Sequence, residues 1–189
     1  YSTYTGEPAI TGSIGTGSNS CFVDAAEVSE EVPAWAYILG DEGSASFICK
    51  RLVSDFLYKK LPAEMAEDFF NTYQLDKDEI ITIVYNKPNA NVYLASFSRF
   101  AGKHMEHPYV KQIVREGFAK FADIHIACFD NYKEVPVHFV GSVGAIFHEI
   151  LEEVLEERGM LLGQIMRKPV DGLIKYHLEY LKVLDAYKV

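Results

Sequence analysis

Residues 9–23 have the sequence AITGSIGTGSNSCFV, in which two apolar runs flank a turn rich in glycine and serine. Ala9–Ile14 leads into the turn and Ser20–Val23 leads out of it, which predicts an antiparallel β-hairpin. The glycines let backbone N–H groups approach a phosphate closely, and the hydroxyls of Thr16 and Ser18 can donate to its oxygens. Short clusters of glycine, serine and asparagine also form ordinary turns, so the loop alone leaves both interpretations open.

A second glycine loop, Gly40–Ser44 with the sequence GDEGS, lies between an expected strand and the start of an expected helix. The carboxylate of Asp41 can accept hydrogen bonds from a sugar hydroxyl or order a magnesium-bound water. It can also cap the helix by accepting from free N–H groups of the first turn, and the local sequence favours this role.

A third loop, Gly141–Gly144 with the sequence GSVG, follows an apolar run. The free N–H groups and partial positive charge at a helix start suit a nucleotide lying across this junction. A tight strand–helix connection with Ser142 as N-cap explains the same residues. Three such loops in one chain favour a surface that holds a phosphorylated ligand against bare backbone.

The spacing of apolar residues predicts strands and helices between these loops. The expected strands are Ala9–Ile14, Ser20–Val23, Trp35–Leu39, Val135–Val140 and Leu161–Met166, with a polar turn over Asp24–Glu31. The expected helices are a stretch from Ile48 to Lys59, Ala63–Tyr73, a stretch from an Asp76 cap through Ile80 to Tyr85, Asn91–Met105, Pro108–Asn131, a helix that begins at Ser142 and runs through Leu155, and Val170–Leu184. This order indicates one α/β domain over residues 1–189, with a mixed sheet that begins with the antiparallel hairpin and continues through crossover helices.

Composition narrows the class of protein. The 189 residues are 49% apolar and 24% charged, which is typical of one soluble globular domain. A net charge of −9 without a clustered basic stripe argues against a nucleic-acid partner. No apolar stretch reaches the roughly 20 residues needed to span a bilayer, so we expect no membrane association.

The cysteines and histidines show no catalytic or metal-binding spacing. Cys21, Cys49 and Cys128 are widely separated and form no C-x-x-C pair, so we expect reduced thiols in a cytoplasmic protein. His125 and Cys128 would share a helical face, but two ligands without further partners make a poor metal site, and no metal site is predicted. Trp35, the only tryptophan, can stack on a sugar face, although a lone tryptophan in a strand more often belongs to a core.

Together, and in this order, the loops resemble the C-terminal lobe of N-acetylglucosamine kinases. More broadly, the chain is similar to BadF/BadG/BcrA/BcrD-type ATPases within the actin-like superfamily of acetate and sugar kinases. The resemblance rests on the phosphate loop Gly15–Asn19, on Trp35 with the G-D-E-G-S-A motif of Gly40–Ala45, on the G-S-V motif of Gly141–Val143, and on the closing helix Pro169–His177. It implies a ribonuclease H-like (actin-like ATPase) fold and an ATP-dependent amino-sugar kinase.

The resemblance implies three groups of site residues. The residues that would contact the phosphates of ATP are Gly15, Thr16, Gly17 and Ser18. Those that would lie against the adenosine are Gly141, Ser142 and Ala145. Those that would line the sugar pocket are Ala34, Trp35 and Asp41, although Ala34 stands where the human-type enzyme has glycine. ATP, Mg²⁺ and an amino sugar are therefore the expected cofactors and substrate, and a second copy of the chain is a candidate partner in a homodimer.

Kinases of this type also need an N-terminal lobe, with a D-G-G-x-S/T phosphate loop and the aspartate that deprotonates the sugar hydroxyl. The chain begins at Tyr1 and contains neither, so we expect no catalytic residue in it, an inactive isolated chain, and the missing lobe as a required partner. Two alternatives stay open. One is an ATPase activator of a 2-hydroxyacyl-CoA dehydratase, which holds a 4Fe–4S cluster through cysteines. The other is a non-catalytic sensor that binds sugar or nucleotide and closes its lobes.

Overall fold

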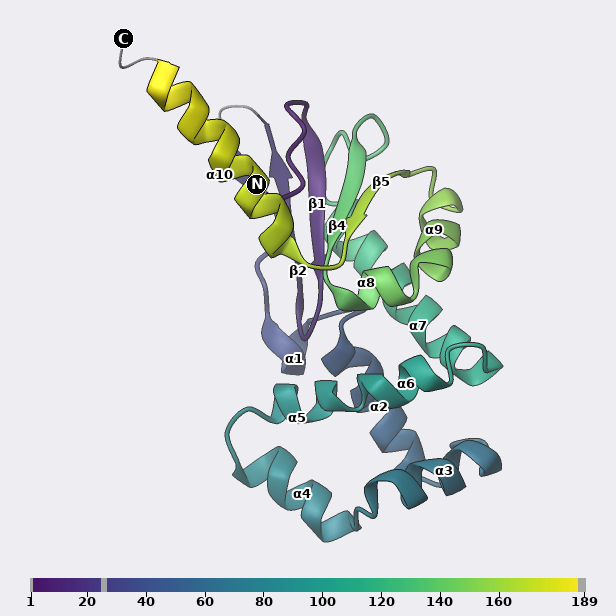
Figure 1. The fold of residues 1–189 in the computed structure, drawn as a ribbon. Coiled ribbons are helices and arrows are strands. Elements are labelled where there is room, and N and C mark those ends of the chain that lie inside the picture. The colour runs from purple at the N-terminus through teal and green to yellow at the C-terminus, as the bar shows by residue number, and fades with distance from the viewer. Residues whose placement is uncertain (1, 25–26, 187–189) are drawn as a thin grey trace.

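The computed structural model describes residues 2–24 and 27–186, without the side chains of residues 171 and 179–186. Tyr1, and Ala25 and Ala26 of the expected polar turn, lie outside the described residues. Within them, five strands form one sheet in the order β3-β2-β1-β4-β5 (Figure 1). The strands are β1 Ala9–Ile14, β2 Ser18–Val23, β3 Val28–Ser29, β4 Pro136–Val140 and β5 Leu161–Met166.

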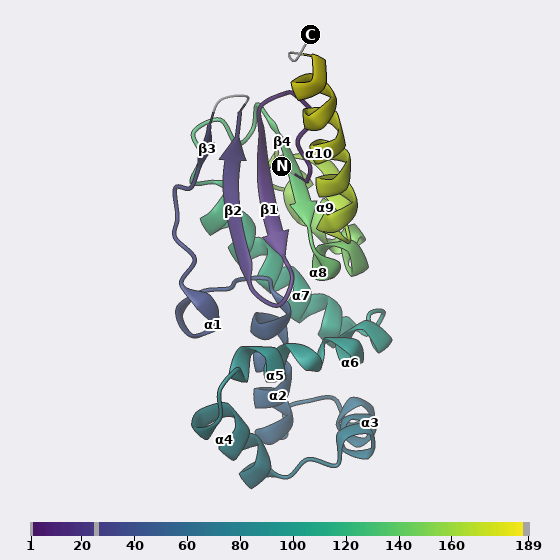
Figure 2. The same ribbon diagram turned by 60° about the vertical axis from the view of Figure 1, so that its left-hand side comes forward.

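The helices divide between the sheet and a separate helical part. Their bounds are α1 Ala36–Leu39, α2 Ala45–Leu57, α3 Ala63–Tyr73, α4 Lys77–Asn86, α5 Ala90–Ser96, α6 Ser98–Lys103, α7 Pro108–Phe121, the π-helix η1 Ala122–Ile126, α8 Ser142–Ile146, α9 His148–Glu156 and α10 Pro169–Ala186. Helices α7, α8 and α9 pack along the sheet, whereas α2–α6 gather beyond the end at which the β1–β2 hairpin turns (Figures 1 and 2). Among the described residues, no helix has the length and apolarity that crossing a membrane requires.

The sheet is mixed, and its strand directions bring three strand ends together. β1 and β2 are antiparallel, with Ile14 opposite Ser18 across the hairpin turn, while β1 is parallel to β4 and β4 is parallel to β5. The carboxyl ends of β1, β4 and β5 therefore lie at one edge, next to the turn of residues 15–17. Ligands of open α/β sheets bind outside the carboxyl ends of the strands, so a ligand site is expected at this edge.

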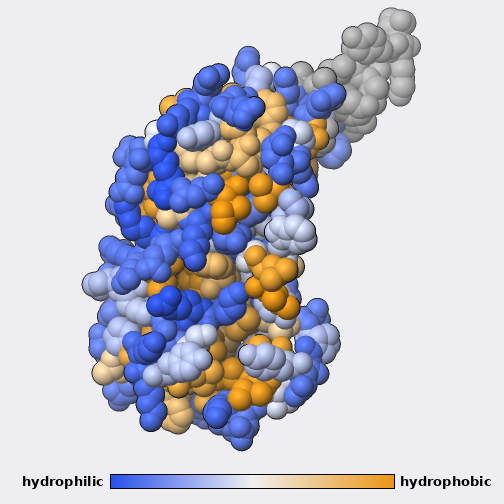
Figure 3. All heavy atoms as spheres, turned by 180° about the vertical axis from the view of Figure 1, so that it is seen from behind, coloured by the Kyte–Doolittle hydropathy of each residue, from blue (hydrophilic) through white to orange (hydrophobic). Residues whose placement is uncertain are grey.

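One hydrophobic core runs through both parts of the molecule. Behind the sheet, the rings of Phe121 and Phe139 lie 6.2 Å apart. In the helical part, Phe69 of α3 contacts a set of aromatic rings at centroid distances of 4.7–5.3 Å, from Phe56, Tyr73, Phe97 and Phe100. Seen from behind, apolar side chains are visible in a hollow between the sheet part and the helical part (Figure 3). The shared core holds the sheet edge and the helices beyond it in one arrangement.

The α/β class and the mixed sheet with an initial antiparallel hairpin are confirmed. Helix α3 and strand β5 have the predicted bounds. Asp76 caps α4 as predicted, because its carboxylate accepts a hydrogen bond from the N–H of Glu79 at 2.7 Å. These elements follow local signals that no distant contact overrides.

The predicted third strand at Trp35–Leu39 is wrong. Residues Ala36–Leu39 form the short helix α1, and Ala36 has a φ of +57°, which a strand residue does not adopt. The outer edge of β2 is instead paired with β3, inside the segment that was expected to be a polar turn. The strand propensity of this aromatic segment therefore did not decide its conformation.

Three of the predicted helices are interrupted. Asn91–Met105 divides at Phe97 into α5 and α6. The helix predicted to begin at Ser142 does so, but it divides at Phe147, where φ is −105° and ψ is +35°, into α8 and α9. The stretch Pro108–Asn131 ends its α-helix at Phe121 and continues as η1 only to Ile126. Apolar periodicity predicts that a segment is helical but does not detect a single-residue break.

Candidate functional site

The three glycine loops meet at the carboxyl edge of the sheet. The carbonyl oxygens of Gly15 and Thr16 accept hydrogen bonds from the first turn of α2, at 2.9 Å from Ala45 N and 3.1 Å from Ser46 N. On the other side, a Cβ on Gly141 would collide with the carbonyl of Ile14, so the third loop is packed directly on the end of β1. The structure thus brings the predicted phosphate loop, the GDEGS loop and the GSVG loop into contact.

Asp41 is tied to the hairpin rather than to its own helix. Its side chain is buried, with 8% of the residue exposed, and Oδ1 accepts from the N–H of Ser18 at 3.0 Å. The hydroxyl of Ser18 donates to the carbonyl of Glu42 at 2.8 Å, which adds a second bond between the same two loops. Gly17 leaves room for this carboxylate, because a Cβ there would lie 2.7 Å from Asp41 Oδ1.

The capping role that the local sequence favours for Asp41 belongs to Ser44. The Ser44 hydroxyl accepts from the N–H of Phe47 at 3.2 Å and is the N-cap of α2. Asp41 has a φ of +60°, outside the extended conformation typical of an N-cap. Its carboxylate is therefore held at the meeting point of two loops, with no capping function there.

Trp35 lies on the surface next to this loop, and the alternative that it belongs to the core is wrong. The residue is 60% exposed, and Ala34 is exposed beside it. The chain turns so tightly through α1 that a Cβ on Gly40 would lie 3.1 Å from the Cβ of Trp35. Lys50 of α2 fixes this turn by donating to the carbonyl of Tyr37 at 2.8 Å. Trp35 is thus held near the start of the Asp41 loop.

The third loop differs in detail from the expected helix start. Gly141 has a φ of +126°, which is favourable only for glycine, and its N–H donates to the carbonyl of Met166 at 2.9 Å. Ser142 makes no side-chain cap and is exposed, and Ala145 is half-buried on the following turn. Because α8 has only five residues, its contribution to anion binding is smaller than that of a long helix.

Sequence reasoning missed a buried histidine at this site. His125 of η1 is 3% exposed, and its Nε2 lies 3.1 Å from Oε2 of Glu42. The hydroxyl of Ser20 on β2 donates to the carbonyl of His125 at 2.7 Å. His125 and Cys128 were predicted to share a helical face. In the structure, Cys128 Sγ contacts the carbonyl of His125 at 3.4 Å. Only folding brings residues 20, 42 and 125 together, so no local sequence signal marks this cluster.

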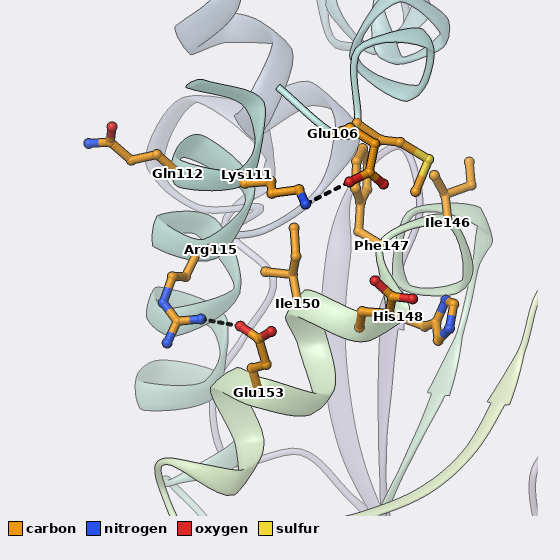
Figure 4. Close-up of a pocket in the computed structure, with 11 residues that line it drawn as sticks. Glu106, Lys111, Gln112, Arg115, Ile146, Phe147, His148, Ile150 and Glu153 are labelled. Atoms are coloured by element: carbon orange, nitrogen blue, oxygen red, sulfur yellow. Dashed lines mark hydrogen bonds and ion pairs between the residues drawn. The ribbon is translucent and has the colours of Figure 1, made fainter. Parts of the chain in front are cut away.

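A pocket of about 310 Å³ lies between α7 and the α8–α9 junction (Figure 4). Phe147 and Ile150 point into it, and its rim carries ion pairs of Lys111 with Glu106 and of Arg115 with Glu153, at 2.7 and 2.8 Å. None of the ten predicted site residues lines this pocket. It begins where α8 ends, past the residues expected to contact adenosine.

The chain matches no protein-family model and no curated protein sequence. Among solved structures, it superposes with a TM-score of 0.88 on a Porphyromonas gingivalis protein provisionally described as an N-acetylglucosamine kinase. The two are 35% identical over 93% of this chain and 62% of that one. A Chromobacterium violaceum protein with the same provisional description has a TM-score of 0.69 and 19% identity over 91% of this chain and 61% of its own, which shows a shared fold.

A Streptomyces griseus glucokinase of the ROK family, solved with glucose and AMPPNP, has a TM-score of 0.44 and 11% identity, too distant for its ligands to bear on this chain. The chain spans about six-tenths of the length of the Porphyromonas and Chromobacterium proteins.

Proposed function

We propose that this chain is the nucleotide- and sugar-binding lobe of an ATP-dependent amino-sugar kinase of the N-acetylglucosamine type. The observation that carries the proposal is the meeting of three glycine loops at one sheet edge, with the buried carboxylate of Asp41 between two of them. The 35% identity to the Porphyromonas gingivalis protein over 93% of the chain supports the same assignment. We further assign the chain to the BadF/BadG/BcrA/BcrD type and to the ribonuclease H-like fold, in line with an antiparallel hairpin followed by parallel strands.

The proposed ligand contacts follow the positions of the loops. Backbone groups of residues 15–18 and the exposed Thr16 would contact the nucleotide phosphates, because a turn without bulky side chains admits close approach. Asp41 would accept from a sugar hydroxyl through Oδ2, since Oδ1 already accepts from Ser18. Trp35 would stack on the sugar face, and its exposure leaves the ring free to do so.

The residues present fit a Mg²⁺ ion that arrives with the nucleotide. Within the part of the chain that the structure describes, no group of three or more His, Cys, Asp or Glu side chains is placed to hold a metal ion. Mg²⁺ commonly keeps several waters and binds through phosphates and one or two carboxylates. Glu42 is paired with His125, and both oxygens of Asp41 are assigned to Ser18 and the sugar, so the ion would be held mainly by phosphate oxygens and water.

We propose that the catalytic base lies in an N-terminal lobe outside this chain. An aspartate of that lobe would take the proton of the sugar 6-hydroxyl, whose oxygen would attack the γ-phosphorus of ATP and release ADP. The 189-residue chain alone is then expected to phosphorylate no sugar.

The test is ADP release by the complete protein with MgATP and N-acetylglucosamine, with glucose and no sugar as controls. Asp41→Asn keeps an oxygen that can accept from Ser18, so it should weaken sugar use while leaving the thermal midpoint nearly unchanged. Asp68→Asn is the matched control, because Asp68 of α3 pairs with Lys103 and His104 in the helical part. A wild-type sugar response in Asp41→Asn would remove Asp41 from the proposed pocket.

The two alternatives give other outcomes of the same assay. ADP release that ignores sugar, together with bound iron, would indicate the ATPase activator. The burial of Cys49, which raises the pKa of its thiol to about 12, argues against this cysteine as a cluster ligand. Nucleotide binding without turnover would indicate the sensor.

A further inference from the structure

The buried pair of His125 and Glu42 joins the GDEGS loop to η1, the π-helix that follows α7. The side chain of Glu42 is only 14% exposed, and the imidazole of His125 is the one hydrogen-bonding partner of its carboxylate among the described residues. A carboxylate this far from water is costly unless it is paired. The Glu42 side chain therefore depends on His125 for its position.

The imidazole itself is held rigidly. It stacks on Phe121 with a centroid distance of 5.0 Å and an interplanar angle of 25°. Nδ1 is buried without a hydrogen-bond partner, so a proton on Nε2 gives the only tautomer that donates to Glu42. The backbone is fixed as well, because the Ser20 hydroxyl donates to the His125 carbonyl. A fixed ring with a single useful donor is suited to orienting the group that it contacts.

The π-helix explains how the histidine reaches the loop. Residues 122–126 leave the α-helical pattern of α7, and η1 packs against β1 and β2. One-turn π segments are frequent at functional sites. Here the π-helix contains the residue that pairs with Glu42.

We propose that His125 is a positioning residue for the GDEGS loop, which carries the proposed sugar ligand Asp41. Glu42 follows Asp41 directly in the chain, and its carbonyl accepts from Ser18, whose N–H donates to Asp41. Donation from His125 to the Glu42 side chain fixes residue 42, and the backbone at residue 42 fixes the orientation of the Asp41 carboxylate. The expected effect of His125 on sugar binding rests on the proposed function, whereas its effect on the position of the Asp41 carboxylate does not.

The loop effect can be measured on the 189-residue chain by amide hydrogen exchange at Ser18. His125→Phe keeps the ring but removes the donor, and should speed exchange of the Ser18 N–H by about tenfold or more, because its acceptor Asp41 loses its support. His125→Gln retains an N–H donor and should restore slow exchange. His138→Phe is the matched control, since His138 is an equally buried histidine on β4 that lies outside the loops.

If Ser18 exchange is the same in His125→Phe as in the wild type, or rises equally in His138→Phe, the proposal is overturned. If His125 served only the stability of the fold, His125→Phe would speed amide hydrogen exchange throughout the sheet. The exchange rates of the β4 amides are therefore compared with that of Ser18.

The sugar effect is measured on the complete protein. His125→Phe should raise the KM for N-acetylglucosamine about tenfold while the KM for ATP stays within about twofold, and His125→Gln should recover most of the loss. Equal changes in both KM values would overturn the proposal that His125 positions the GDEGS loop for the sugar. If the wild-type protein phosphorylates no amino sugar, the proposed function fails, and the exchange result still decides whether His125 positions Asp41.

Discussion

Gly17→Ala is the sharpest test of the contact between the hairpin and the GDEGS loop. The added Cβ would lie 2.7 Å from Asp41 Oδ1, whereas ordinary van der Waals contact begins at 3.4 Å. The carboxylate must therefore move by several tenths of an ångström, and its 3.0 Å hydrogen bond from Ser18 N lengthens or breaks. The backbone at Gly17 does not itself forbid alanine, because its φ lies outside the left-handed region.

The size of the effect follows from two opposing contributions. A hydrogen bond to a charged acceptor contributes about 1.5–3 kcal/mol to the free energy of unfolding, and a buried site that loses it has no water to replace it. Replacing glycine by alanine raises the free energy of unfolding by about 0.4–1 kcal/mol, because alanine restricts the unfolded chain. The net cost should be about 1–2 kcal/mol, which lowers the thermal midpoint of a chain of this size by about 2–8 °C.

Gly15→Ala provides the matched control on the same turn, because a Cβ there meets nothing within 4 Å. Calorimetric or circular-dichroism melts of both variants, compared with the wild type, isolate the contact with Asp41. We expect Gly15→Ala to melt at or slightly above the wild-type temperature and Gly17→Ala to melt below it. Equal melting temperatures for the two variants would refute the packing of Asp41 against the hairpin.

Three further predictions concern other parts of the chain. Gly141→Ala should cost roughly 3–5 kcal/mol in urea unfolding, because φ is +126° and the new Cβ collides with the Ile14 carbonyl; a cost below about 1 kcal/mol would contradict the close contact of the loops. The ammonium of Lys103, and then His104, lower the pKa of the Asp68 carboxyl. The stability from this pair is present above the unfolded pKa and is lost as the pH falls through the folded one, so between about pH 5 and pH 3 the melting temperature should fall more steeply in the wild type than in Asp68→Asn. Cys49, whose pKa burial raises to about 12, should resist thiol reagents at about pH 8 in the native state and react in urea, and rapid native labelling would contradict its burial.

The parts of the fold that could be predicted are those encoded by neighbouring residues. The glycine-rich turn between Ile14 and Ser18 predicts the hairpin, and the run Leu161–Met166 predicts β5 with its correct bounds. Both signals depend on turn residues and apolar alternation within a few positions. The breaks at Phe97 and Phe147 carry no such mark, since apolar periodicity continues through both.

The site was predicted as a set of loops but not as a set of contacts. Glycine content alone indicates which segments can approach a phosphate, and the three loops do meet. The assignment of the helix cap to Ser44 instead of Asp41 depends on Ser18, which competes for the carboxylate from another strand. The pairing of Glu42 with His125 joins residues that are 83 positions apart in the sequence, and only the fold makes them neighbours.

The segment where sequence-based prediction failed most is also the one to which we assign the sugar. Ala36 and Asp41 have φ values of +57° and +60°, and a non-glycine residue in the left-handed region costs about 1–2 kcal/mol. Local preference thus opposes this conformation, and it persists because Lys50 holds the carbonyl of Tyr37 and Ser18 holds Asp41 from other elements. Lys59, Gln74 and Asn89 have similar φ values outside the three loops, so a left-handed residue alone does not mark a ligand site. Local rules failed between Trp35 and Asp41 because contacts from β2 and α2, which are distant in the chain, determine the backbone there.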